Sequence, residues 1–376
     1  MHENMANVSN IKYCFGCGVC AAACPKKIID LVLNEEGFYI PRIVTPAKCV
    51  DCGLCLEVCA FSHADLALES SPLASYAAWT EDESYRLRCS SGGVSYELGK
   101  YALRKGWSVC GVKYDVTHHR AEHYVAKSLP EWEYSMGSKY LQSYTMGAFG
   151  MLRNGRYLVV GTPCQIDSLR RYARRFRIED DFLFVDFFCH SVPSMWLWNK
   201  YIEAISKRID SVKAVAWRDK AFGWHDSWSM TFNDDYHSRL TQGDRFYELF
   251  LGDFCANQAC VKNCKYKYDK SSADIRIGDC WGRTYAKNEK GVSSVVAFTK
   301  KGLSVLEEAD CVLVEHPFAI VTEGQMKHNV SNAHLAFIAR FFLRRQWIPL
   351  TSKVWDFLIF CEKAVTFIFS KIRSKK

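Results

Sequence analysis

The sequence predicts an α+β protein in which a small cysteine-rich module precedes a larger mixed α/β domain. Two observations predict this division. Eight of the 18 cysteines fall within the first 66 of 376 residues, and predicted strands and helices alternate from about Gly93 onward. Such alternation is typical of layered α/β folds. Because 49% of the residues are hydrophobic and 14% are aromatic, the chain has material for a sizeable core and is not mainly disordered.

The length favours more than one domain, since single cores rarely grow past about 250–300 residues. We expect the cysteine-rich module at 1–66 and a linker at 67–85, where the stretch around 70–75 is rich in Ser, Pro and Ala. The main domain is expected at 86–345, and a basic amphipathic tail at 346–376.

Apolar runs and turn residues place the elements of the main domain in order along the chain. The expected helices are 93–104, 165–174, 193–205 and 301–309. The expected strands are 107–114, 157–162, 182–188, 273–278, 294–299 and 311–315. Pro163 stands near the first turn of the second helix, where its missing N–H costs nothing.

Two cysteine runs repeat the same spacing within the first module. The first run is Cys14, Cys17, Cys20 and Cys24, and the second is Cys49, Cys52, Cys55 and Cys59. This spacing is that of bacterial dicluster iron–sulfur proteins, in which the fourth cysteine of each run binds the other cluster. We therefore expect one [4Fe–4S] cluster on Cys14, Cys17, Cys20 and Cys59, and a second on Cys49, Cys52, Cys55 and Cys24. Structural zinc is the alternative for paired Cys-x2-Cys motifs, but each run offers three close thiols plus one.

Ten cysteines remain in the main domain and tail. Cys110, Cys311 and Cys361 lie in apolar segments and are expected in the core. A possible third metal centre is expected at Cys255, Cys260 and Cys264, in a polar loop. Its fourth ligand would come from Cys164, Cys189 or Cys280, and chance clustering is an equal alternative.

Several further motifs occur in a fixed order. They are Ser90-Ser91-Gly92-Gly93, Gly137 to Ser143, Gly161-Thr162-Pro163-Cys164-Gln165, Cys189-His190 with Pro193-Ser194, Arg218-Asp219-Lys220 with Gly223-Trp224, and Asp274 with Gly278-Asp279 and Trp281-Gly282. Together they resemble the beta-subunit family of the coenzyme F-420 hydrogenases and dehydrogenases over about residues 1–300, with a fused ferredoxin module. The resemblance implies an FAD-binding main domain, because this subunit binds FAD and iron–sulfur clusters in the family. It does not imply one substrate, since characterised members oxidise a reduced deazaflavin and a plant relative reduces a chlorophyll derivative.

The pairing of cofactors is chemically coherent. A cluster passes one electron at a time, whereas a flavin takes two and releases them singly. The sequence lacks a Gly-x-Gly-x-x-Gly motif after a strand, so no nicotinamide site is indicated.

The resemblance also implies which residues contact the flavin. The expected cofactor-binding residues are Ser90, Ser91, Gly92, Gly93, Lys139, Gly161, Thr162, Cys164, Gln165 and Asp279. The Ser-Gly run would cradle a phosphate at a helix N-terminus, with Lys139 beside it. The alternative for the Ser-Gly run is an ordinary helix cap, and the alternative for Lys139 is a solvated surface lysine. Cys164 and Gln165 would otherwise mark a helix start with a buried thiol, and Asp279 would otherwise close a turn.

The candidate catalytic residues are His190, Arg218, Asp219 and Lys220. A charged turn would account for Arg218 to Lys220 equally well. His190 would equally fit a core histidine whose ring is hydrogen-bonded. His118, His119 and His123 form a small group that fits a strand face or turn as readily as a metal site.

The net charge of +8 is concentrated at the C-terminus. From Arg340 onward nine basic residues face two acids, a net +7, so a uniformly basic nucleic-acid-binding surface is not supported. The basic residues are Arg340, Arg344, Arg345, Lys353, Lys363, Lys371, Arg373, Lys375 and Lys376. The tail fits either peripheral membrane contact or a core-packing helix with a basic end.

We therefore expect an FAD- and iron–sulfur-dependent oxidoreductase. It would pass single electrons between its clusters and FAD, and exchange hydride with a small organic substrate or a deazaflavin coenzyme. The expected partner is a ferredoxin-type or other redox protein, and no nucleic acid. The alternatives are a non-catalytic electron-transfer subunit of a larger complex and a zinc-bearing interaction protein. A polar N-terminus and the lack of a long apolar run predict a cytoplasmic location.

Overall fold

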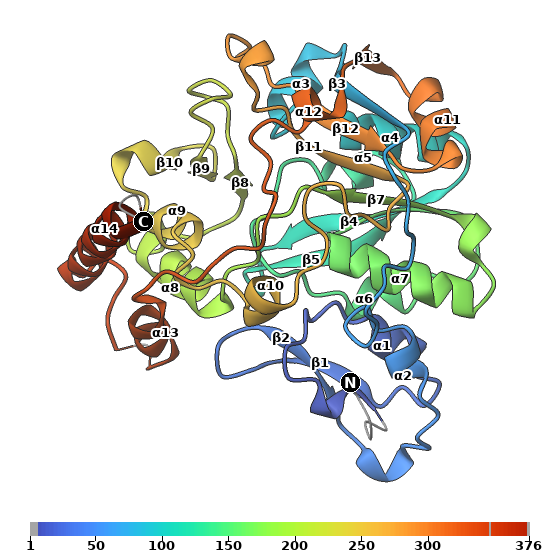
Figure 1. The fold of residues 1–376 in the computed structure, drawn as a ribbon, viewed down its shortest axis with the longest axis horizontal. Coiled ribbons are helices and arrows are strands. Elements are labelled where there is room, and N and C mark those ends of the chain that lie inside the picture. The colour runs from blue at the N-terminus through green and yellow to red at the C-terminus, as the bar shows by residue number, and fades with distance from the viewer. Residues whose placement is uncertain (1–6, 346, 374–376) are drawn as a thin grey trace.

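The computed structural model describes residues 7–345 and 347–373. Residues 1–6 of the predicted first module lie outside the described residues. The same holds for residues 346 and 374–376 of the predicted tail, which include Lys375 and Lys376. An eight-stranded sheet forms the centre, with the cysteine-rich module below it in Figure 1 and a smaller helical and sheet region to one side. The fold is thus mixed α/β with a small ferredoxin-like module, as the sequence predicted.

The cysteine-rich module consists of two short helices and a hairpin. Its elements are α1 (Val19–Ala23), β1 (Ile29–Leu33), β2 (Tyr39–Ile43) and α2 (Leu54–Glu57). The strands β1 and β2 pair antiparallel. Each helix begins after a glycine in the left-handed region, Gly18 at φ 78° and Gly53 at φ 74°. Only a residue without Cβ turns there at little cost, and each of these two glycines follows a cysteine of a run.

The central sheet has the strand order β13-β3-β12-β11-β7-β6-β4-β5. Its strands are β3 (Ala74–Thr80), β4 (Ser108–Asp115), β5 (Arg120–Ala126), β6 (Tyr157–Val160), β7 (Phe182–Phe187), β11 (Ile275–Asp279), β12 (Ser293–Ala297) and β13 (Cys311–Glu315). The four strands β4, β6, β7 and β11 run parallel, and antiparallel strands flank them on both sides. The carboxyl ends of the parallel strands therefore open at one edge, where α/β sheets commonly bind ligands.

Helices cover both faces of this sheet. They are α3 (Glu83–Arg88), α4 (Val94–Arg104), α5 (Leu129–Glu133), α6 (Met146–Phe149), α7 (Pro163–Arg175), α11 (Lys300–Glu308) and α12 (Phe318–Val321). Side chains alternate between two separate cores, because successive residues of a strand point to opposite faces. Along β7, Leu183 and Val185 join the core under α4 and α11, while Phe182 and Phe184 join the core under α7.

A second, smaller region packs beside the sheet. It contains a three-stranded sheet of β8 (Val215–Trp217), β9 (Ser229–Phe232) and β10 (Tyr236–Arg239), in the order β10-β9-β8. Its helices are α8 (Met195–Ile205), α9 (Arg245–Leu251), α13 (Ala336–Arg345) and α14 (Lys353–Arg373), whereas α10 (Gln258–Lys262) packs on Phe15 and Ala60 of the cysteine-rich module. Trp198, Trp217, Phe246 and Trp355 are all buried in one core shared by this region.

The predicted linker at 67–85 is wrong for most of its length. Residues 74–80 form β3, which lies between β12 and β13 in the central sheet, and α3 begins at Glu83. The small residues there were misleading, because Ala77 and Ala78 are fully buried where helices pack closely on the sheet. The expected helices and strands of the main domain are all present, with ends shifted by a few residues.

Candidate functional site

Four of the N-terminal thiols gather beside helix α7. Burial, followed by repulsion from Cys17, Cys14, Cys59 and Cys55, raises the pKa of Cys20, and burial followed by repulsion from Cys17 and Cys59 raises the pKa of Cys14. Burial, followed by repulsion from Cys59, raises the pKa of Cys17 to about 11. This is the first predicted set, in which Cys59 joins the three thiols of the other run.

The second predicted set lines a small hollow of about 30 Å³. Its four thiols are Cys24, Cys49, Cys52 and Cys55. Cys52 is exposed, whereas the first set consists of the half-buried Cys14 and Cys17 and the buried Cys20 and Cys59. The second set is therefore the outer one, toward solvent.

A third group of thiols lies between the module and the main domain. Burial, followed by repulsion from Cys260, Cys17 and Cys189, raises the pKa of Cys164, and Cys264 acts in the same way on Cys189 and Cys260. Burial raises the pKa of Cys189 to about 11 and that of Cys260 to about 12. The predicted third centre at Cys255, Cys260 and Cys264 is thus only partly right, because only Cys260 and Cys264 belong to this group.

Cys255 is the residue that does not belong to this group. Its side chain is 1% exposed in the apolar core around α8 and α9, and its Sγ lies 3.9 Å from the carbonyl oxygen of Leu249. The loop after α9 turns Cys255 inward, while α10 carries Cys260 to the other side. Cys280 is also buried elsewhere, beside Trp224.

Helix α7 explains why the third group adjoins the first. Cys164 and Ser168 are four residues apart, so they share one helix face. The hydroxyl of Ser168 accepts a bond from the Cys17 thiol at 3.4 Å and from the Ala60 amide at 3.0 Å. Cys164 therefore faces the module that holds the first set.

The donor chemistry of the three groups fits iron–sulfur clusters. Among residues 7–345 and 347–373, no three His, Cys, Asp or Glu side chains converge closely enough for a single metal ion. A cubane binds each thiolate to a different iron, so its ligands stand further apart than those of one ion. Lys267 donates to the carbonyl oxygens of Cys189 and His190, both at 2.6 Å, and places a positive charge beside the third group.

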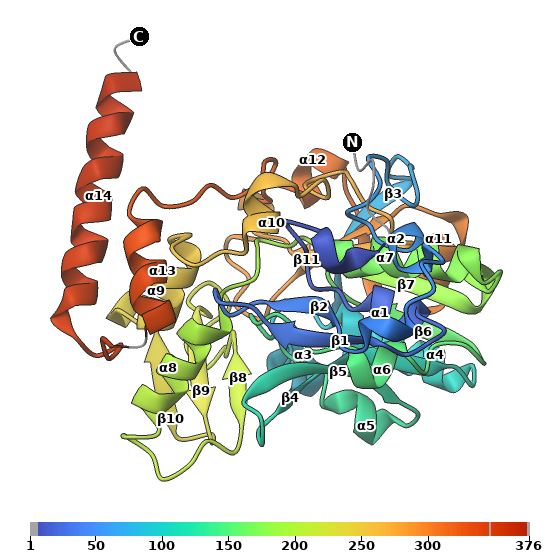
Figure 2. The ribbon, with the colours of Figure 1, turned by 90° about the horizontal axis from the view of Figure 1, so that it is seen from below.

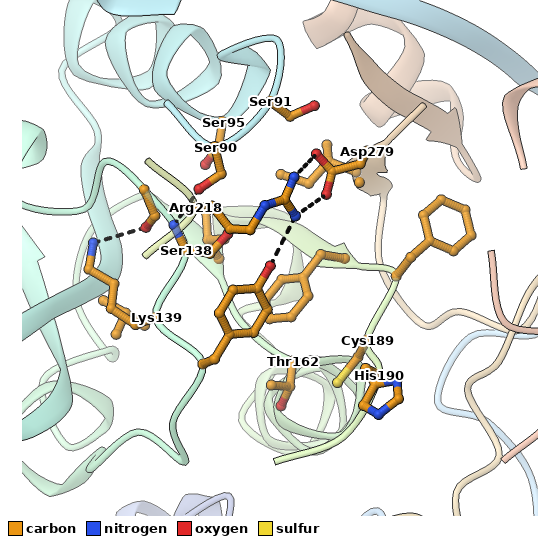
Figure 3. Close-up of a pocket in the computed structure, with 18 of the residues that line it drawn as sticks. Ser90, Ser91, Ser95, Ser138, Lys139, Thr162, Cys189, His190, Arg218 and Asp279 are labelled. Carbon is orange, nitrogen blue, oxygen red and sulfur yellow. Dashed lines mark hydrogen bonds and ion pairs between the residues drawn. The ribbon is translucent and has the colours of Figure 1, made fainter. Parts of the chain in front are cut away.

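A pocket of about 440 Å³ opens at the carboxyl ends of the parallel strands. This volume lies within the usual range for small-molecule and cofactor sites. The pocket is lined at the end of β6 by Val160 and Gly161, at the end of β7 by Phe187 and Phe188, and at the end of β11 by Asp279. Figure 3 shows Ser90, Ser91 and Ser95 at one end of the pocket and Cys189 and His190 at the other. Because Cys189 also belongs to the third thiol group, the pocket and that group share a wall.

Helix α4 points its N-terminus into this pocket. Its N-cap residue is Gly93, at φ 88°, and no side chain caps the helix. Ser90, Ser91, Val94 and Ser95 line the pocket around the free amides. Such a terminus favours an anionic group.

Three buried polar atoms in the pocket wall have no hydrogen-bond partner. They are His123 Nδ1, Ser191 Oγ and Tyr266 Oη. Buried polar groups are normally satisfied, so these atoms fit a polar ligand. His123 Nε2 lies 3.2 Å from the Val160 carbonyl oxygen, and burial lowers the pKa of His123 to about 4.

Arg218 and Asp279 form a buried ion pair at the pocket wall. The guanidinium donates to Asp279 Oδ2 at 3.0 Å, to the Tyr140 hydroxyl at 3.2 Å and to Ser227. It also lies 4.7 Å from the ring centroids of both Trp228 and Trp281. Burial lowers the pKa of Arg218, but Asp279 and Tyr140 outweigh it and raise the pKa. Arg218 is thus a fixed cation at the pocket, and it is not part of an exposed charged turn.

Two of the four catalytic candidates do not line the pocket. Asp219 accepts from Thr231 and from the Ala221 amide. Lys220 donates to the carbonyl oxygens of Arg86, Ser91 and Lys290 at 2.6–2.7 Å, and so holds the loop before α4. His190 does line the pocket, and its Nε2 lies 2.9 Å from Asp253 Oδ1.

Most predicted cofactor-binding residues line the pocket. They are Ser90, Ser91, Gly93, Lys139, Gly161, Thr162, Gln165 and Asp279. Gly92 lies behind the wall, where an added Cβ would stand 2.3 Å from the Ala78 carbonyl oxygen. Cys164 belongs to the third thiol group.

Lys139 and Gln165 have roles that the sequence did not reveal. Lys139 Nζ donates to the carbonyl oxygens of Tyr134, Met136 and Gly137, and burial lowers its pKa to about 7. All three of its donors are used within its own loop. The side chain of Gln165 completes a capping box with Thr162 at the start of α7.

The three histidines near residue 120 have separate partners. His118 bonds to Asp115 in a turn, His119 bonds to the Tyr114 hydroxyl, and His123 is buried in β5.

Comparison with known proteins gives two family matches. Residues 13–62 match the 4Fe-4S dicluster domain, and residues 154–316 match the C terminus of the coenzyme F420 hydrogenase/dehydrogenase beta subunit. The two matched segments follow one another in that order, and residues 154–316 are similar to the beta-subunit family. The resemblance inferred from the motifs is confirmed. No curated protein was found to match the chain.

A solved structure of the F420-reducing [NiFe] hydrogenase complex from Methanosarcina barkeri, derivatised with xenon, also aligns with the chain. The identity is 16% and the TM-score is 0.46, and the alignment covers 78% of this chain and 94% of that one.

In the part of the chain that the structure describes, no helix is long and apolar enough to cross a membrane.

Proposed function

We propose that the chain is an iron–sulfur flavoprotein oxidoreductase. It exchanges electrons one at a time with a redox partner protein and two at a time with a small organic substrate or deazaflavin. The observation that carries the proposal is the wall shared by the large pocket and the third thiol group, because Cys189 belongs to both.

The residues of the pocket fit FAD. The N-terminus of α4 and its serines would hold the pyrophosphate, and Lys220 would keep the Ser91 loop in place. Arg218, fixed by Asp279, would supply a positive charge beside the ring system. A bound flavin supplies the step between paired and single electrons.

The thiol groups form an inward sequence. The outer group contains the exposed Cys52, the middle group contains Cys17, and the inner group contains Cys164 and Cys189. Each group is proposed to hold one [4Fe–4S] cluster. In the inner group the ligands are Cys164, Cys189, Cys260 and Cys264.

His190 is the proposed proton donor or acceptor for the organic substrate. It lines the pocket beside Cys189, and Asp253 fixes its ring through Nε2. Histidine is the side chain that most often transfers protons in general acid–base catalysis.

The test is anaerobic purification followed by iron, sulfide and flavin analysis. Three clusters predict about twelve iron atoms per chain, together with one FAD. Cys260→Ser should lower the iron content to about eight, because it removes an inner ligand. Cys255→Ala is the matched control, since its thiol lies in the apolar core, and it should keep all the iron.

Each contrary result has a definite meaning. About eight iron atoms in the unaltered chain would reject the inner cluster while leaving the other two. Iron without flavin would contradict the proposal of an enzyme and would favour a non-catalytic electron-transfer subunit. Zinc in place of iron would contradict both the enzyme and the electron-transfer subunit.

A further inference from the structure

Helix α14 presents two apolar faces, and the protein covers only one of them. Trp355, Leu358 and Ile359 are buried against α13 and the core around α8. On the other side Phe357 and Phe360 are each 69% exposed, Phe367 is 58% exposed and Ile368 is 55% exposed. In a surface helix of a globular protein, the face turned away from the core is normally polar.

The exposed side chains form one continuous line. Phe357, Phe360, Ala364, Phe367 and Ile368 recur at spacings of three and four residues or lie next to each other, so they share a helix face. We call these five residues the outward stripe. Figure 2 shows the second half of α14 extending beyond the rest of the fold.

Helix α13 and Trp347, which lies between α13 and α14 in the chain, carry further exposed aromatic side chains. Phe337 is 69% exposed, Phe341 is 47% exposed, and Trp347 is 69% exposed. The rings of Phe341 and Trp347 lie 6.2 Å apart, and the Arg345 guanidinium lies 5.5 Å from each. Exposed apolar patches of this extent in soluble proteins mark interaction sites.

The charges around the stripe are positive. Lys353 and Lys371 are eighteen residues apart, five helical turns, and so stand at the two ends of the same face. Lys371 Nζ lies 4.6 Å from the Phe367 ring. Of the two acids of the helix, Glu362 is 12% exposed and pairs with His334, whereas Asp356 is 63% exposed beside the stripe and its charge is paired with Arg245.

We propose that the outward stripe, together with Phe337, Phe341 and Trp347, docks on an anionic lipid bilayer. Phenylalanine and tryptophan side chains flanked by lysine and arginine are typical of helices that lie in the membrane interface. The cations complement an anionic surface, as they would not complement a neutral one. The helix lies along the bilayer and does not cross it, in keeping with its lack of a spanning segment.

The test is co-sedimentation of the full chain with lipid vesicles under anaerobic conditions. One set of vesicles is pure phosphatidylcholine, and the other contains phosphatidylglycerol as well. We expect binding to the anionic vesicles that weakens as salt is raised. The double variant Phe357→Ser and Phe360→Ser should bind at least about tenfold more weakly, since two apolar side chains no longer insert. Charge reversal with Arg345→Glu and Lys353→Glu should abolish the preference for anionic vesicles.

Phe222→Ser is the matched control. Phe222 is 46% exposed, is not part of the outward stripe, and has the Arg239 guanidinium over its ring. The Phe222→Ser variant should bind the anionic vesicles as the unaltered chain does. All variants have surface substitutions, and an unchanged absorption spectrum and circular dichroism establish that they fold.

Two outcomes would overturn the proposal. One is equal binding of the unaltered chain and the double variant to anionic vesicles. The other is concentration-dependent self-association of the unaltered chain, abolished in the double variant, without vesicle binding, which would assign the stripe to a second copy of the chain.

Discussion

At the scale of single residues, burial decides what each polar group of the pocket can do. His123 lies in β5 with 1% exposure, bonds through one ring nitrogen and keeps the other free. Asp253, which fixes His190, has a positive φ of 58°, a conformation that costs energy in a residue with a side chain. Such strain is concentrated at functional sites in proteins.

The lowered pKa of His123 predicts how stability depends on pH. The folded state keeps this ring neutral down to about pH 4, whereas the unfolded chain takes up the proton near 6.5. Between these values the unfolded state binds more protons, so stability falls as the pH falls. His123→Gln should reduce the loss of unfolding free energy between pH 7 and pH 5 by about 2 kcal/mol.

Urea unfolding under anaerobic conditions at the two pH values measures this difference. His118→Gln is the control, because His118 is exposed in a turn beside Asp115. An identical pH dependence in the His123→Gln variant and the unaltered chain would contradict the prediction.

At the scale of elements, two helices build the site. The N-terminus of α7 carries Cys164 toward the dicluster module, and its Thr162 and Gln165 cap face the pocket. The N-terminus of α4 brings free amides to the far end of the pocket. The helices lie on opposite faces of the sheet, so the pocket spans the edge between them (Figures 1 and 3).

The start of α4 gives a prediction about backbone conformation. Gly93→Ala should destabilise the protein by about 1–2 kcal/mol, because φ 88° is left-handed. The added Cβ would also stand 2.8 Å from Thr80 Cγ2. The loop must then shift, and we expect the purified variant to retain less FAD than the unaltered chain.

Gly106→Ala separates these two effects. Gly106 follows the same helix at φ 75° and has open space around it. It should lose similar stability in thermal unfolding yet keep its FAD. Equal loss of flavin in both variants would show that the turn at Gly93 has no special part in binding.

At the scale of the whole molecule, the domains are arranged as a path from surface to interior. The dicluster module packs on α7 through Cys17, Ala60 and Ser168. The amide of Ala67 bonds to Asp167 Oδ2 at 2.8 Å, so the connecting segment is held as well. Such an arrangement suits electron transfer through successive clusters.

The outer thiol group should therefore control electron entry without affecting the pocket. Cys52→Ser should slow reduction of the flavin by a ferredoxin-type donor by at least about tenfold, because the outer cluster loses a ligand. Flavin content should stay unchanged, since Cys52 is exposed and remote from the pocket wall. Anaerobic stopped-flow measurement of flavin reduction tests this.

Cys361→Ser is the control for that experiment. Cys361 lies in α14, outside all three thiol groups. An unchanged reduction rate in the Cys52→Ser variant would place electron entry elsewhere.

The sequence alone determined the local features of this protein. Ligand spacing in the two N-terminal runs follows from contacts between near neighbours, so the thiol sets could be predicted from it. The strand and helix periods of the main domain are local as well, and Leu183 and Phe184 alternate between cores as β7 predicts. The order of the motifs was also sufficient to reveal the resemblance to the beta-subunit family.

Only the tertiary structure decided which distant residues meet. Cys164, Cys189, Cys260 and Cys264 are separated by up to a hundred residues, and the sheet and α7 bring them together, while Cys255 turns into the core. The pairing of Arg218 with Asp279 depends on the same long-range packing. Residues 74–80 formed a strand against local composition, because burial between β12 and β13 outweighs the propensity of small residues for loops.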